Sequence, residues 1–407
     1  MSSKPEQKTI LLAVSSSIAI YKSCELCRRL KERGANVYVA MTENAQKLVS
    51  PILFESLSGN AVITGMFSNS RQPVPISHIS LSHVIDLFII APATANLIAK
   101  SACGIADDWI TTSLLATTAP VLWAPAMNPQ MYTNPATQKN IQILSERGHH
   151  FIGPFIGTTA CGEVGQGRMA ELEIILEKID ILLTKNKNLT GKKVLITSGP
   201  TQEPIDPVRY ISNRSSGKMG RELALEAIKR GAEVTVVSGP SVEKLPYHSN
   251  SVYVQTAQEM YEQVLKLFPE CDVFIASAAV ADYSVIKPLE HKKKRTDEAL
   301  LLELTPNPDI LGEMGKRKNE KQIVIGFAAE TNNLIENAKE KLRNKNLDLI
   351  VVNKVGGEKC AFGSEFAYAT IITPDGIENE PSLTPKRELV QKLYDKIEEL
   401  LKKKEAI

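Results

Sequence analysis

Two stretches of the chain repeat one pattern of hydrophobic and polar positions. "KTILLAVSSSIA" begins at Lys8 and "KKVLITSGPT" begins at Lys192, and in each an apolar run passes into a loop of small residues. Such a run between polar residues predicts a fully buried strand. In both places a helix ending in Arg-Gly-Ala and a second strand follow, as "LKERGANVYVAMT" and "IKRGAEVTVVSGP". The pattern therefore predicts an internal repeat.

The repeat continues further along the chain. Residues 84–96, "VIDLFIIAPATAN", match residues 270–283, "ECDVFIASAAVADY", in pattern. Strands that alternate with helices, without hairpin signals, indicate a parallel sheet. We therefore predict an α/β protein with two doubly wound, Rossmann-like domains. Ligands of such sheets bind at the carboxyl ends of the strands, which points to the loops after Val14, Ile90, Ser198 and Ile275.

The length of the chain also favours two domains, because 407 residues exceed one typical hydrophobic core. Between the two copies lies "LLTKNKNLTGKK" (182–193), whose Lys, Asn and Gly content predicts a short exposed linker. We place the boundary at Lys187, which gives domains 1–187 and 188–407. From Thr384 onward the sequence predicts a C-terminal amphipathic helix.

Composition narrows the classes of function. The chain is 43% hydrophobic and 23% charged with a formal net charge of +2, which is typical of a globular protein and does not indicate a nucleic-acid partner. The N-terminus lacks an apolar signal core, and no apolar run is long enough to span a bilayer. Six cysteines in such a long chain do not form a disulfide framework. We expect a cytoplasmic protein without a membrane segment.

Cys24 and Cys27 form a C-x-x-C pair inside a helical pattern. Such a pair serves redox or metal chemistry in some proteins. Here the two residues share one helix face, and no second Cys or His pair follows at metal-binding spacing. Helix packing is the favoured interpretation, because free Cys behaves as a small hydrophobic residue.

Polar residues at the predicted strand ends of the first domain could bind a phosphate. Neither copy has the G-x-G-x-x-G fingerprint of dinucleotide binding, but "SSSIAIYK" (15–22) places hydroxyl and N–H groups at a helix start. Such groups suit a monophosphate, and hence FMN. The candidate FMN-binding residues at these strand ends are Ser15, Ser17, Thr42, Thr94 and Asn96.

The stretch "TTACGEVGQGRM" (158–169) places Cys161 before three glycines, at 162, 165 and 167. Glycine makes a backbone mobile, so the stretch could be a lid that carries a thiol. The alternative is an ordinary surface loop with an incidental cysteine.

Four motifs taken together resemble the FMN-dependent cysteine decarboxylases, specifically phosphopantothenoylcysteine decarboxylase. They are "SHI" with His78, "APATAN", "PAMNPQMY" with Asn128 and "ACGEVGQGRM" with Cys161, and the resemblance covers residues 8 to about 182. It implies that His78 is the active-site base, in preference to the nearby His83, which we take to be structural. It also implies that Asn128 binds the substrate carboxylate.

The same resemblance gives Cys161 the role of proton donor. Decarboxylation needs an electron sink, which an aminoethyl thiol lacks and which its oxidation to a thioaldehyde would provide. A thiol on a closing loop suits the later protonation step, because closure excludes water. The family usually has glycine where this chain has Ser16. Because Ser accepts positive φ less readily than Gly, this departure bears on the geometry of the phosphate loop and not on the cofactor.

The second copy opens with a long polar loop, "SGPTQEPIDPVRYISNRSSGKMGRE" (198–222), that leads into a helix. Free N–H groups and positive charge at a helix start predict a phosphate site, although the P-loop pattern is absent. Downstream lies the basic run Lys292, Lys293, Lys294 and Arg295. It could be a solvated surface or an import-like patch, but a mobile clamp on a nucleotide triphosphate is the favoured interpretation.

Residues 190 to about 400 resemble phosphopantothenate–cysteine ligase, a family that uses CTP to form an acyl-cytidylate. The resemblance assigns Asn213 to the acyl-cytidylate and Lys292 to the activation step. The family's K-x-K-K motif ends here in Arg295, which keeps the charge but not the shape. A divalent metal, Mg²⁺, is expected with the triphosphate, with unknown ligands. The implied nucleotide-binding residues are Ala278, Asp282, Lys292, Pro308, Asp309, Ile310, Leu311, Phe327, Lys341 and Lys345.

The two resemblances fit together, because the product of the ligase is the substrate of the decarboxylase. They imply a bifunctional enzyme of coenzyme A biosynthesis acting on 4′-phosphopantothenate, L-cysteine and CTP. Family trimers of the flavin domain and dimers of the ligase domain imply a dodecameric homo-oligomer. Two alternatives are an inhibitory phosphatase subunit, which often has an acidic tail that is lacking here, and a nicotinamide-dependent reductase, which needs the missing fingerprint.

Overall fold

The structure is a computed structural model that describes residues 7–66, 78–295, 297, 299–354 and 364–405. It divides into two compact units, Met1–Leu183 and Thr184–Ile407. The predicted domain limits, 1–187 and 188–407, differ slightly from these units and stay a prediction. In the described part of the chain, no helix has both the length and the apolar character needed to cross a membrane.

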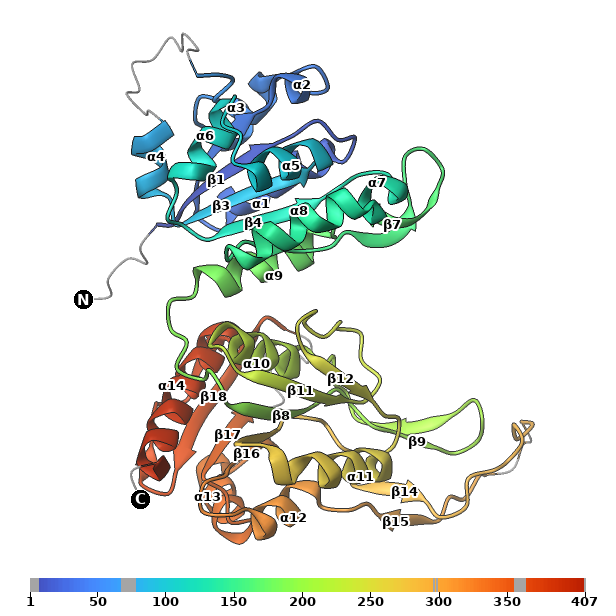
Figure 1. Ribbon diagram of the computed structural model, residues 1–407. Helices are drawn as coiled ribbons and strands as arrows, with labels where there is room; N and C mark the ends of the chain where they lie inside the picture. The colour runs from blue at the N-terminus through green and yellow to red at the C-terminus, as the bar shows by residue number, and fades with distance from the viewer. Residues whose placement is uncertain (1–6, 67–77, 296, 298, 355–363, 406–407) are drawn as a thin grey trace. The chain divides into compact units, whose positions relative to one another are not determined.

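The N-terminal unit is built on a parallel sheet with the strand order β2-β1-β3-β4-β5 (Figure 1). Its strands are β1 (Thr9–Val14), β2 (Asn36–Met41), β3 (Leu87–Ala93), β4 (Val121–Pro125) and β5 (His150–Phe151). The described helices are α1 (Ile20–Glu32), α2 (Glu43–Gln46), α3 (Pro51–Ser58), α4 (His78–Val84), α5 (Ala95–Cys103), α6 (Trp109–Ala116), α7 (Pro129–Thr133), α8 (Pro135–Glu146) and α9 (Leu172–Leu183). The predicted doubly wound α/β fold is confirmed for this unit.

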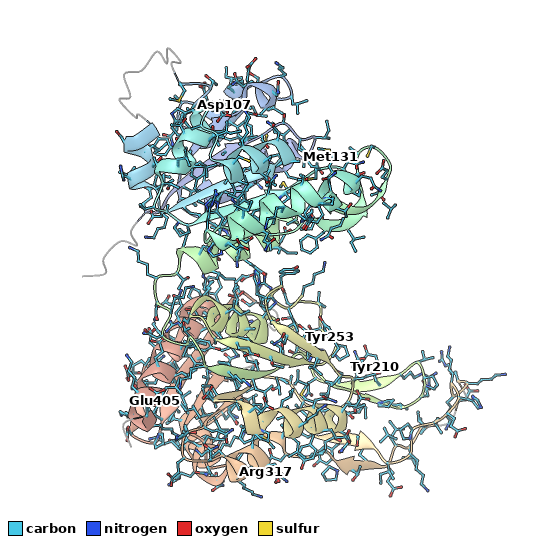
Figure 2. All side chains as sticks on the ribbon, in the orientation of Figure 1. Asp107, Met131, Tyr210, Tyr253, Arg317 and Glu405 are labelled. Carbon is cyan, nitrogen blue, oxygen red and sulfur yellow. The ribbon has the colours of Figure 1, made fainter. Side chains whose placement is uncertain are left out.

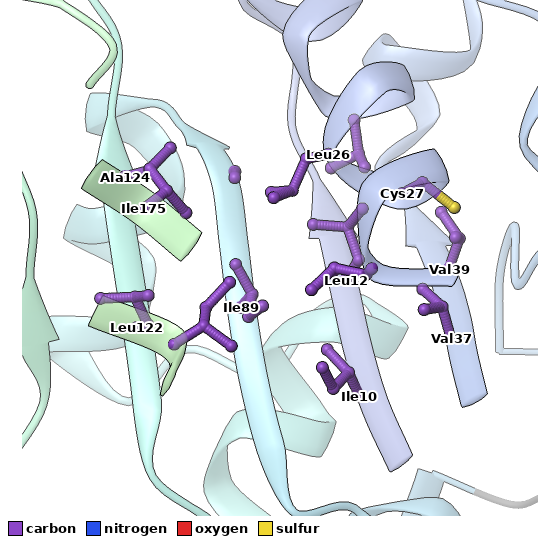
Figure 3. Close-up of a cluster of buried hydrophobic side chains, with 14 of the residues drawn as sticks. Ile10, Leu12, Leu26, Cys27, Val37, Val39, Ile89, Leu122, Ala124 and Ile175 are labelled. Carbon is purple, nitrogen blue, oxygen red and sulfur yellow. The ribbon is translucent and has the colours of Figure 1, made fainter. Parts of the chain in front are cut away.

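Side chains that alternate along β1 bury both faces of this sheet. Ile10 and Leu12 pack with residues of α1, α3 and α9 (Figure 3), whereas Leu11 packs with residues of α4, α5, α6 and α8. Cys27 lies in the first of these clusters, and burial raises the pKa of its thiol to about 11. The packing interpretation of the C-x-x-C pair agrees with this position.

The C-terminal unit has a longer sheet with the order β12-β11-β8-β13-β16-β17-β18-β19, and β20 also pairs with β18. The pairs from β12 to β17 are parallel, as predicted, but β17 and β18 are antiparallel. The strands are β8 (Lys193–Ser198), β11 (Glu233–Ser238), β12 (Asn250–Tyr253), β13 (Val273–Ala276), β16 (Ile323–Glu330), β17 (Leu349–Lys354), β18 (Phe366–Thr373), β19 (Gly376–Ile377) and β20 (Ser382–Pro385). The helices are α10 (Lys218–Lys229), α11 (Ala257–Leu267), α12 (Ile310–Arg317), α13 (Leu334–Asn344) and α14 (Lys386–Glu405), with a short 3₁₀ turn at Phe268–Glu270.

Three antiparallel hairpins lie outside the main sheets, although no hairpin signal was recognised in the sequence. They are β6 (Phe155–Thr158) with β7 (Val164–Arg168), β9 (Gln202–Pro204) with β10 (Tyr210–Ser212), and β14 (Tyr283–Val285) with β15 (Leu304–Pro306). Their strands are short and few of their residues are fully buried, so they lack the alternating apolar pattern that predicts a strand. Figure 2 labels Tyr210 on one of these hairpins.

In the predicted linker at 182–193, Lys187, Asn188 and Thr190 are exposed as expected, but the central part also bonds to the C-terminal unit. Asn186 and Asn188 donate hydrogen bonds from Nδ2 to the Glu398 carboxylate in α14, at 3.1 and 2.7 Å. Leu189 is fully buried, and its N–H bonds to the Arg230 carbonyl. Because buried Glu398 and Arg230 need hydrogen-bond partners, the polar segment folds onto the C-terminal unit and becomes part of it.

Candidate active sites

Ser15 joins two strands at the carboxyl edge of the N-terminal sheet. Its hydroxyl donates to the Pro92 carbonyl at 2.7 Å and accepts from the Thr94 N–H at 3.0 Å. The side chain is buried, and its single O–H donor is used within the protein. Ser15 therefore ties β1 to the end of β3, and its role in FMN binding stays a prediction.

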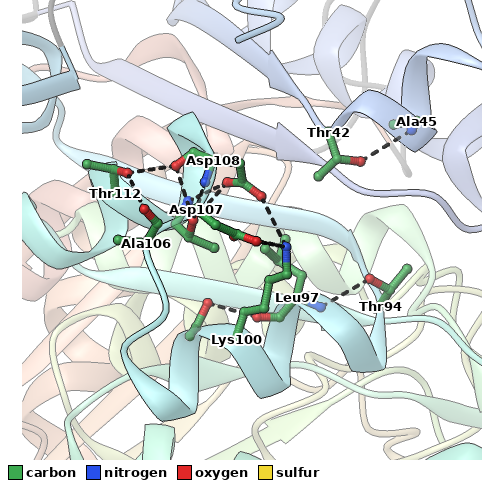
Figure 4. A network of polar contacts seen from close by, with 11 residues as sticks. Thr42, Ala45, Thr94, Leu97, Lys100, Ala106, Asp107, Asp108 and Thr112 are labelled. Carbon is green, nitrogen blue, oxygen red and sulfur yellow. Dashed lines mark hydrogen bonds and ion pairs between the residues drawn. The ribbon is translucent and has the colours of Figure 1, made fainter. Parts of the chain in front are cut away.

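The remaining predicted FMN-binding side chains lie at helix starts along the same edge. The hydroxyl oxygens of Thr42 and Thr94 cap α2 and α5 by accepting from backbone N–H groups at 3.2 and 3.4 Å (Figure 4). A capping hydroxyl keeps its own hydrogen for donation. Ser17 lies in the loop before α1, and exposed Asn96 lies in the first turn of α5.

The start of α1 suits a phosphate. The helix follows Ala19, whose methyl side chain cannot cap it, and the Ile20 and Lys22 N–H groups donate to the Ser17 and Ala19 carbonyls at 3.0 Å each, so the attraction for an anion comes from the positive end of the helix dipole. Among the described residues, only Asn333 and Asn346 combine a positive φ with a side chain. Ser16 is therefore accommodated without the left-handed backbone that would have required glycine.

Asn128 and Cys161, predicted from separate motifs, are brought together in the structure. Asn128 follows β4 and caps α7, where its Oδ1 accepts from the Gln130 N–H at 2.8 Å. Its Nδ2 lies 3.6 Å from the Cys161 Sγ and 2.8 Å from the Glu163 Oε2. Both partners belong to the turn between β6 and β7. The sequence analysis did not single out Glu163.

Two of the three glycines that follow Cys161 serve close packing, whereas a Cβ at Gly162 would meet no atom within 4 Å. The expectation of a mobile lid stays a prediction. A Cβ at Gly165 would lie 2.8 Å from the Pro129 side chain, and one at Gly167 would lie 2.2 Å from the Met127 carbonyl. Met127 also donates its N–H to the Gly167 carbonyl at 3.0 Å. β7 is therefore held directly against the segment that carries Asn128, and this contact fixes the position of the thiol.

The thiol of Cys161 is exposed and surrounded by donors. A hydrogen bond with the Thr159 hydroxyl at 3.0 Å, a backbone bond at Glu163 and the Asn128 amide together lower its pKa below the ordinary thiol value. Thr159 was also missed in the sequence. Thr159 and Glu163 flank Cys161 at two residues on either side, a spacing that carries no signal until the hairpin turn is known.

The histidine prediction is not resolved by geometry. His78 is the first residue of α4, and its side chain lies outside the part of the structure that is described. His83 is in the last turn of the same helix and is exposed. The choice of His78 as the base stays a prediction.

In the C-terminal unit, a cavity of about 710 Å³ lies at the carboxyl edge of the sheet. Ten of the residues predicted to bind acyl-cytidylate or nucleotide line it: Asn213, Ala278, Asp282, Pro308, Asp309, Ile310, Leu311, Phe327, Lys341 and Lys345. Asn213 donates from Nδ2 to the Val280 carbonyl at 2.8 Å. The cavity therefore unites residues that are distant in the chain.

Two cations of this cavity, Lys341 and Lys345, are paired with acids. Lys345 Nζ lies 2.8 Å from Asp309 Oδ1, and Lys341 Nζ lies 2.5 Å from Glu330 Oε1. Burial alone would raise the pKa of Asp309, but its bonds with Lys345 and the Gly312 N–H bring the pKa below the usual value. An anionic ligand would compete with these carboxylates for the two ammonium groups.

A smaller cavity of about 190 Å³ shares Arg214, Ala278 and Phe327 with the larger one. It includes Lys218 at the start of α10, and Gly217, which has no side chain, precedes that helix. Burial, and then the charge of Lys218, lower the pKa of Lys386 in its wall. Positive charge and a helix start agree with the phosphate site predicted at "NRSSGKMG".

Lys292 is not among the described residues that line either cavity. Its neighbour Lys293 is held by the β9–β10 hairpin, because Arg209 Nη2 donates to the Lys293 carbonyl at 3.0 Å. The Lys293 N–H also bonds to Asp206 at 3.4 Å. Within the described ranges, no group of three or more His, Cys, Asp and Glu side chains could hold a metal ion.

Two family models match the chain. The Flavoprotein family matches residues 1–184, and the DNA/pantothenate metabolism flavoprotein C-terminal domain matches residues 189–401. Fold and family therefore define an α/β flavoprotein with a second α/β domain.

Full-length relatives narrow this class. The coenzyme A biosynthesis bifunctional protein CoaBC of Bacillus subtilis (strain 168) is 44% identical over 398 residues, 97% of this chain and 98% of the relative. CoaBC of Escherichia coli (strain K12) is 43% identical over 393 residues, 96% of each chain. The chain belongs to the family of bifunctional coenzyme A biosynthesis proteins, which combine a decarboxylase and a ligase.

Solved structures resemble the two parts separately. A crystal structure of the C-terminal domain of CoaBC is 40% identical, covers 53% of this chain and 99% of its own, and has a TM-score of 0.44. The FMN-dependent cysteine decarboxylase SpaF is 28% identical, covers 44% of this chain and 95% of its own, and has a TM-score of 0.38.

Proposed function

We propose that the C-terminal unit joins L-cysteine to 4′-phosphopantothenate through an acyl-cytidylate, and that the N-terminal unit decarboxylates the product, 4′-phosphopantothenoylcysteine, to 4′-phosphopantetheine with FMN as cofactor. The observation that supports the second step best is the approach of Asn128 Nδ2 to Cys161 Sγ at 3.6 Å. Membership in the family supports both steps. It gives no support to the alternatives of a phosphatase subunit or a nicotinamide-dependent reductase.

The edge of the N-terminal sheet has the chemistry to hold FMN. Ser17, Thr42, Thr94 and Asn96 offer small polar groups there, beside the positive end of the α1 dipole, which favours an anion. Flavin would supply the two-electron oxidation and reduction that amino-acid side chains cannot. The buried tie of Ser15 keeps the ends of β1 and β3 together beneath this site.

The protein's own groups bind the substrate and move protons. The Asn128 amide donates to the substrate carboxylate, and His78 acts as the base. Loss of CO₂ leaves a carbon that must gain a proton, which Cys161 donates from its thiol. The resulting thiolate is stabilised by the Asn128 amide, which is already placed to donate to sulfur, and by the Thr159 hydroxyl 3.0 Å away, whose single O–H turns from the Glu163 carbonyl to the charged sulfur.

In the ligase unit, the large cavity binds the nucleotide and the acyl group. A carboxylate oxygen of phosphopantothenate attacks the α-phosphorus of CTP and pyrophosphate leaves. The cysteine amine then attacks the acyl carbon and CMP leaves. Lys341 and Lys345 balance phosphate charge, Asn213 orients the acyl-cytidylate, and the smaller cavity receives further phosphate groups. Lys292 would act in the first step after movement of its loop.

Mg²⁺ is proposed as a companion of the triphosphate. Mg²⁺ usually keeps several waters and binds through substrate phosphates with one or two carboxylates. Asp282 and Asp309 in the cavity wall are the carboxylates available for that purpose. A homo-oligomer and a cytoplasmic location remain predictions from the sequence.

The test is to follow product formation by the purified full-length chain with mass spectrometry. With 4′-phosphopantothenate, L-cysteine and CTP, we expect 4′-phosphopantetheine, CMP and pyrophosphate. Omitting cysteine should leave an acyl-cytidylate, and ATP in place of CTP tests the nucleotide preference. Formation of phosphopantothenoylcysteine without its decarboxylation, by protein that contains bound flavin, would contradict the decarboxylase proposal alone.

A further inference from the structure

The hydrogen bonds of the Asn128 amide can be accounted for completely. Its oxygen accepts from the Gln130 N–H at 2.8 Å, so its nitrogen faces the β6–β7 turn. An amide nitrogen has two N–H donors. One is directed to Glu163 Oε2 at 2.8 Å and the other to Cys161 Sγ at 3.6 Å. Both donors are therefore engaged by residues of the turn, and one of the two partners is a carboxylate.

The backbone and the side chain of Glu163 make separate contacts. Its carbonyl accepts from the Thr159 N–H at 2.9 Å and from the Thr159 hydroxyl at 3.0 Å, and these bonds close the turn. Its side chain is exposed. The carboxylate can therefore exchange the Asn128 amide for water at small cost, without opening the turn that positions Cys161.

We propose that the Glu163 carboxylate occupies, in the free enzyme, the place on Asn128 that the substrate carboxylate takes, and that the substrate displaces it into water. This inference rests on the proposed decarboxylase function. Two carboxylates sharing one donor would repel each other, so the two occupants exclude one another. Glu163 is then a positioning residue that the substrate must move.

The exchange also makes the binding of substrate differ from the binding of product. Once CO₂ has left, the product has no carboxylate with which to hold the amide, and Glu163 returns to it. Glu163 thus weakens the binding of any ligand that needs the amide. A ligand without a carboxylate does not need the amide and is not affected. This difference between two kinds of ligand is what an experiment can measure.

Binding is measured by calorimetry on the full-length, flavin-containing protein with two unreactive probes. One is 4′-phosphopantothenoylserine, which keeps the carboxylate but has a hydroxyl in place of the thiol. The other is 4′-phosphopantothenoylethanolamine, which also lacks the carboxylate. The variants are Glu163→Gln, which removes the charge, and Glu163→Ala, which removes the acceptor. Glu146→Gln is the matched control, because Glu146 is exposed in α8 and bonds only locally to Gln142.

We expect both Glu163 variants to bind the serine probe roughly two- to fivefold more tightly, the range for release of an exposed charged contact. Binding of the ethanolamine probe and of both probes to Glu146→Gln should not change. Equal changes for the two probes, weaker binding of the serine probe, or the same gain in the control would overturn the inference. Failure of the unaltered protein to bind either probe would instead overturn the proposed substrate.

Discussion

In the N-terminal unit the loop from β1 to α1 covers residues 15–19, whereas the corresponding loop from β8 to α10 covers residues 199–217 and contains β9 and β10. The short loop leads directly from the carboxyl end of β1 to the start of α1. The long loop helps to line two adjoining cavities. Arg214 lines both of them, and Asn213 lines the larger one. We therefore expect the same position in two copies of one plan to receive different ligands because the loops differ in length.

The parts that the two copies share are structural. In the first copy the Ser15 hydroxyl accepts from the Thr94 N–H at 3.0 Å, and in the second the Thr197 hydroxyl accepts from the Ala278 N–H at 3.3 Å. Each bond joins the end of the first strand of the repeat, β1 or β8, to the segment that follows the adjacent strand, β3 or β13. Because two different sites contain the same tie, we assign it to the scaffold and not to either chemistry.

The largest effect is expected where the two sites differ most, at the thiol. Cys161→Ser should slow formation of 4′-phosphopantetheine by roughly 10²–10⁴-fold, because the proton donor is lost, and should leave ligation unchanged. An oxidised, decarboxylated product should accumulate and be visible by mass spectrometry. Cys103→Ser, at the other exposed cysteine of this unit, is the control. An unchanged rate of phosphopantetheine formation in Cys161→Ser would remove Cys161 from the mechanism.

The ligase site offers the next largest effect, a separation of its two half-reactions. Lys292→Gln should slow pyrophosphate release from CTP and phosphopantothenate by roughly 10²–10³-fold, the usual effect of removing one well-placed charge donor. Asn213→Asp should release pyrophosphate once per site and then stall with acyl-cytidylate retained. Single-turnover pyrophosphate release distinguishes the two.

Lys294→Gln is the matched control for the basic run. Since Lys292 does not line the described cavity walls, unchanged pyrophosphate release in both the Lys292 and the Lys294 variant would show that the loop does not reach the nucleotide. Loss of the first step in both Lys292→Gln and Asn213→Asp would contradict the division of roles but not the ligase function.

The strands of both sheets could be predicted because both faces of each sheet are buried. Such strands have continuous runs of apolar residues, as in β1 and β8. The β6–β7 hairpin could not be predicted, because the sequence of β7, "VGQGR", has no strand pattern. Its two glycines are required by close contacts with Met127 and Pro129. The contacts of the segment 182–193 could not be predicted for a related reason. Asn188 bonds to Glu398, which is 210 residues away in the chain.

The site was predictable only where single residues carry the chemistry. Asn128 and Cys161 stand out by type and motif, and the fold brings them together. Thr159 and Glu163 act through hydrogen bonds that exist only once the turn forms. In the second unit, ten predicted residues share one cavity, yet the acids that pair with its cations include Glu330, which no motif indicated.

A moderate effect on stability is expected at the segment that separates the two copies. Asn188→Ala removes a 2.7 Å hydrogen bond to buried Glu398 and should lower the free energy of unfolding of the C-terminal unit by about 1–3 kcal/mol. Thr190→Ala, in the same segment but bonded only to the nearby Lys187 carbonyl, is the control. Urea unfolding at neutral pH measures both, and an equal loss in the two variants would contradict the role given to Glu398.

The same bond predicts a dependence on pH. Burial raises the pKa of Glu398, but its bonds with Asn188 and Arg230 outweigh this and bring the pKa below the usual glutamate value. A lowered pKa in the folded protein means that stability is present above the unfolded-state value and is lost as the pH falls through the folded-state value. The difference between the unaltered protein and Asn188→Ala should therefore shrink on acidification.

The smallest effect is expected at Thr159, which tunes the thiol without supplying the proton. A thiol that acts as an acid must be protonated, so decarboxylase activity should decline as the pH rises through the pKa of Cys161. Because the Thr159 hydroxyl is the largest of the contacts that lower this pKa, Thr159→Val should raise it and move the decline to higher pH. The ligase has no such thiol in its cavity walls as described and should keep its profile. The decarboxylase and ligase rates are measured across the pH range on one preparation of the full-length protein. Thr112→Val, in α6 and distant in sequence from Thr159, is the control. A decline that stays at the same pH in Thr159→Val would mean that another group sets it.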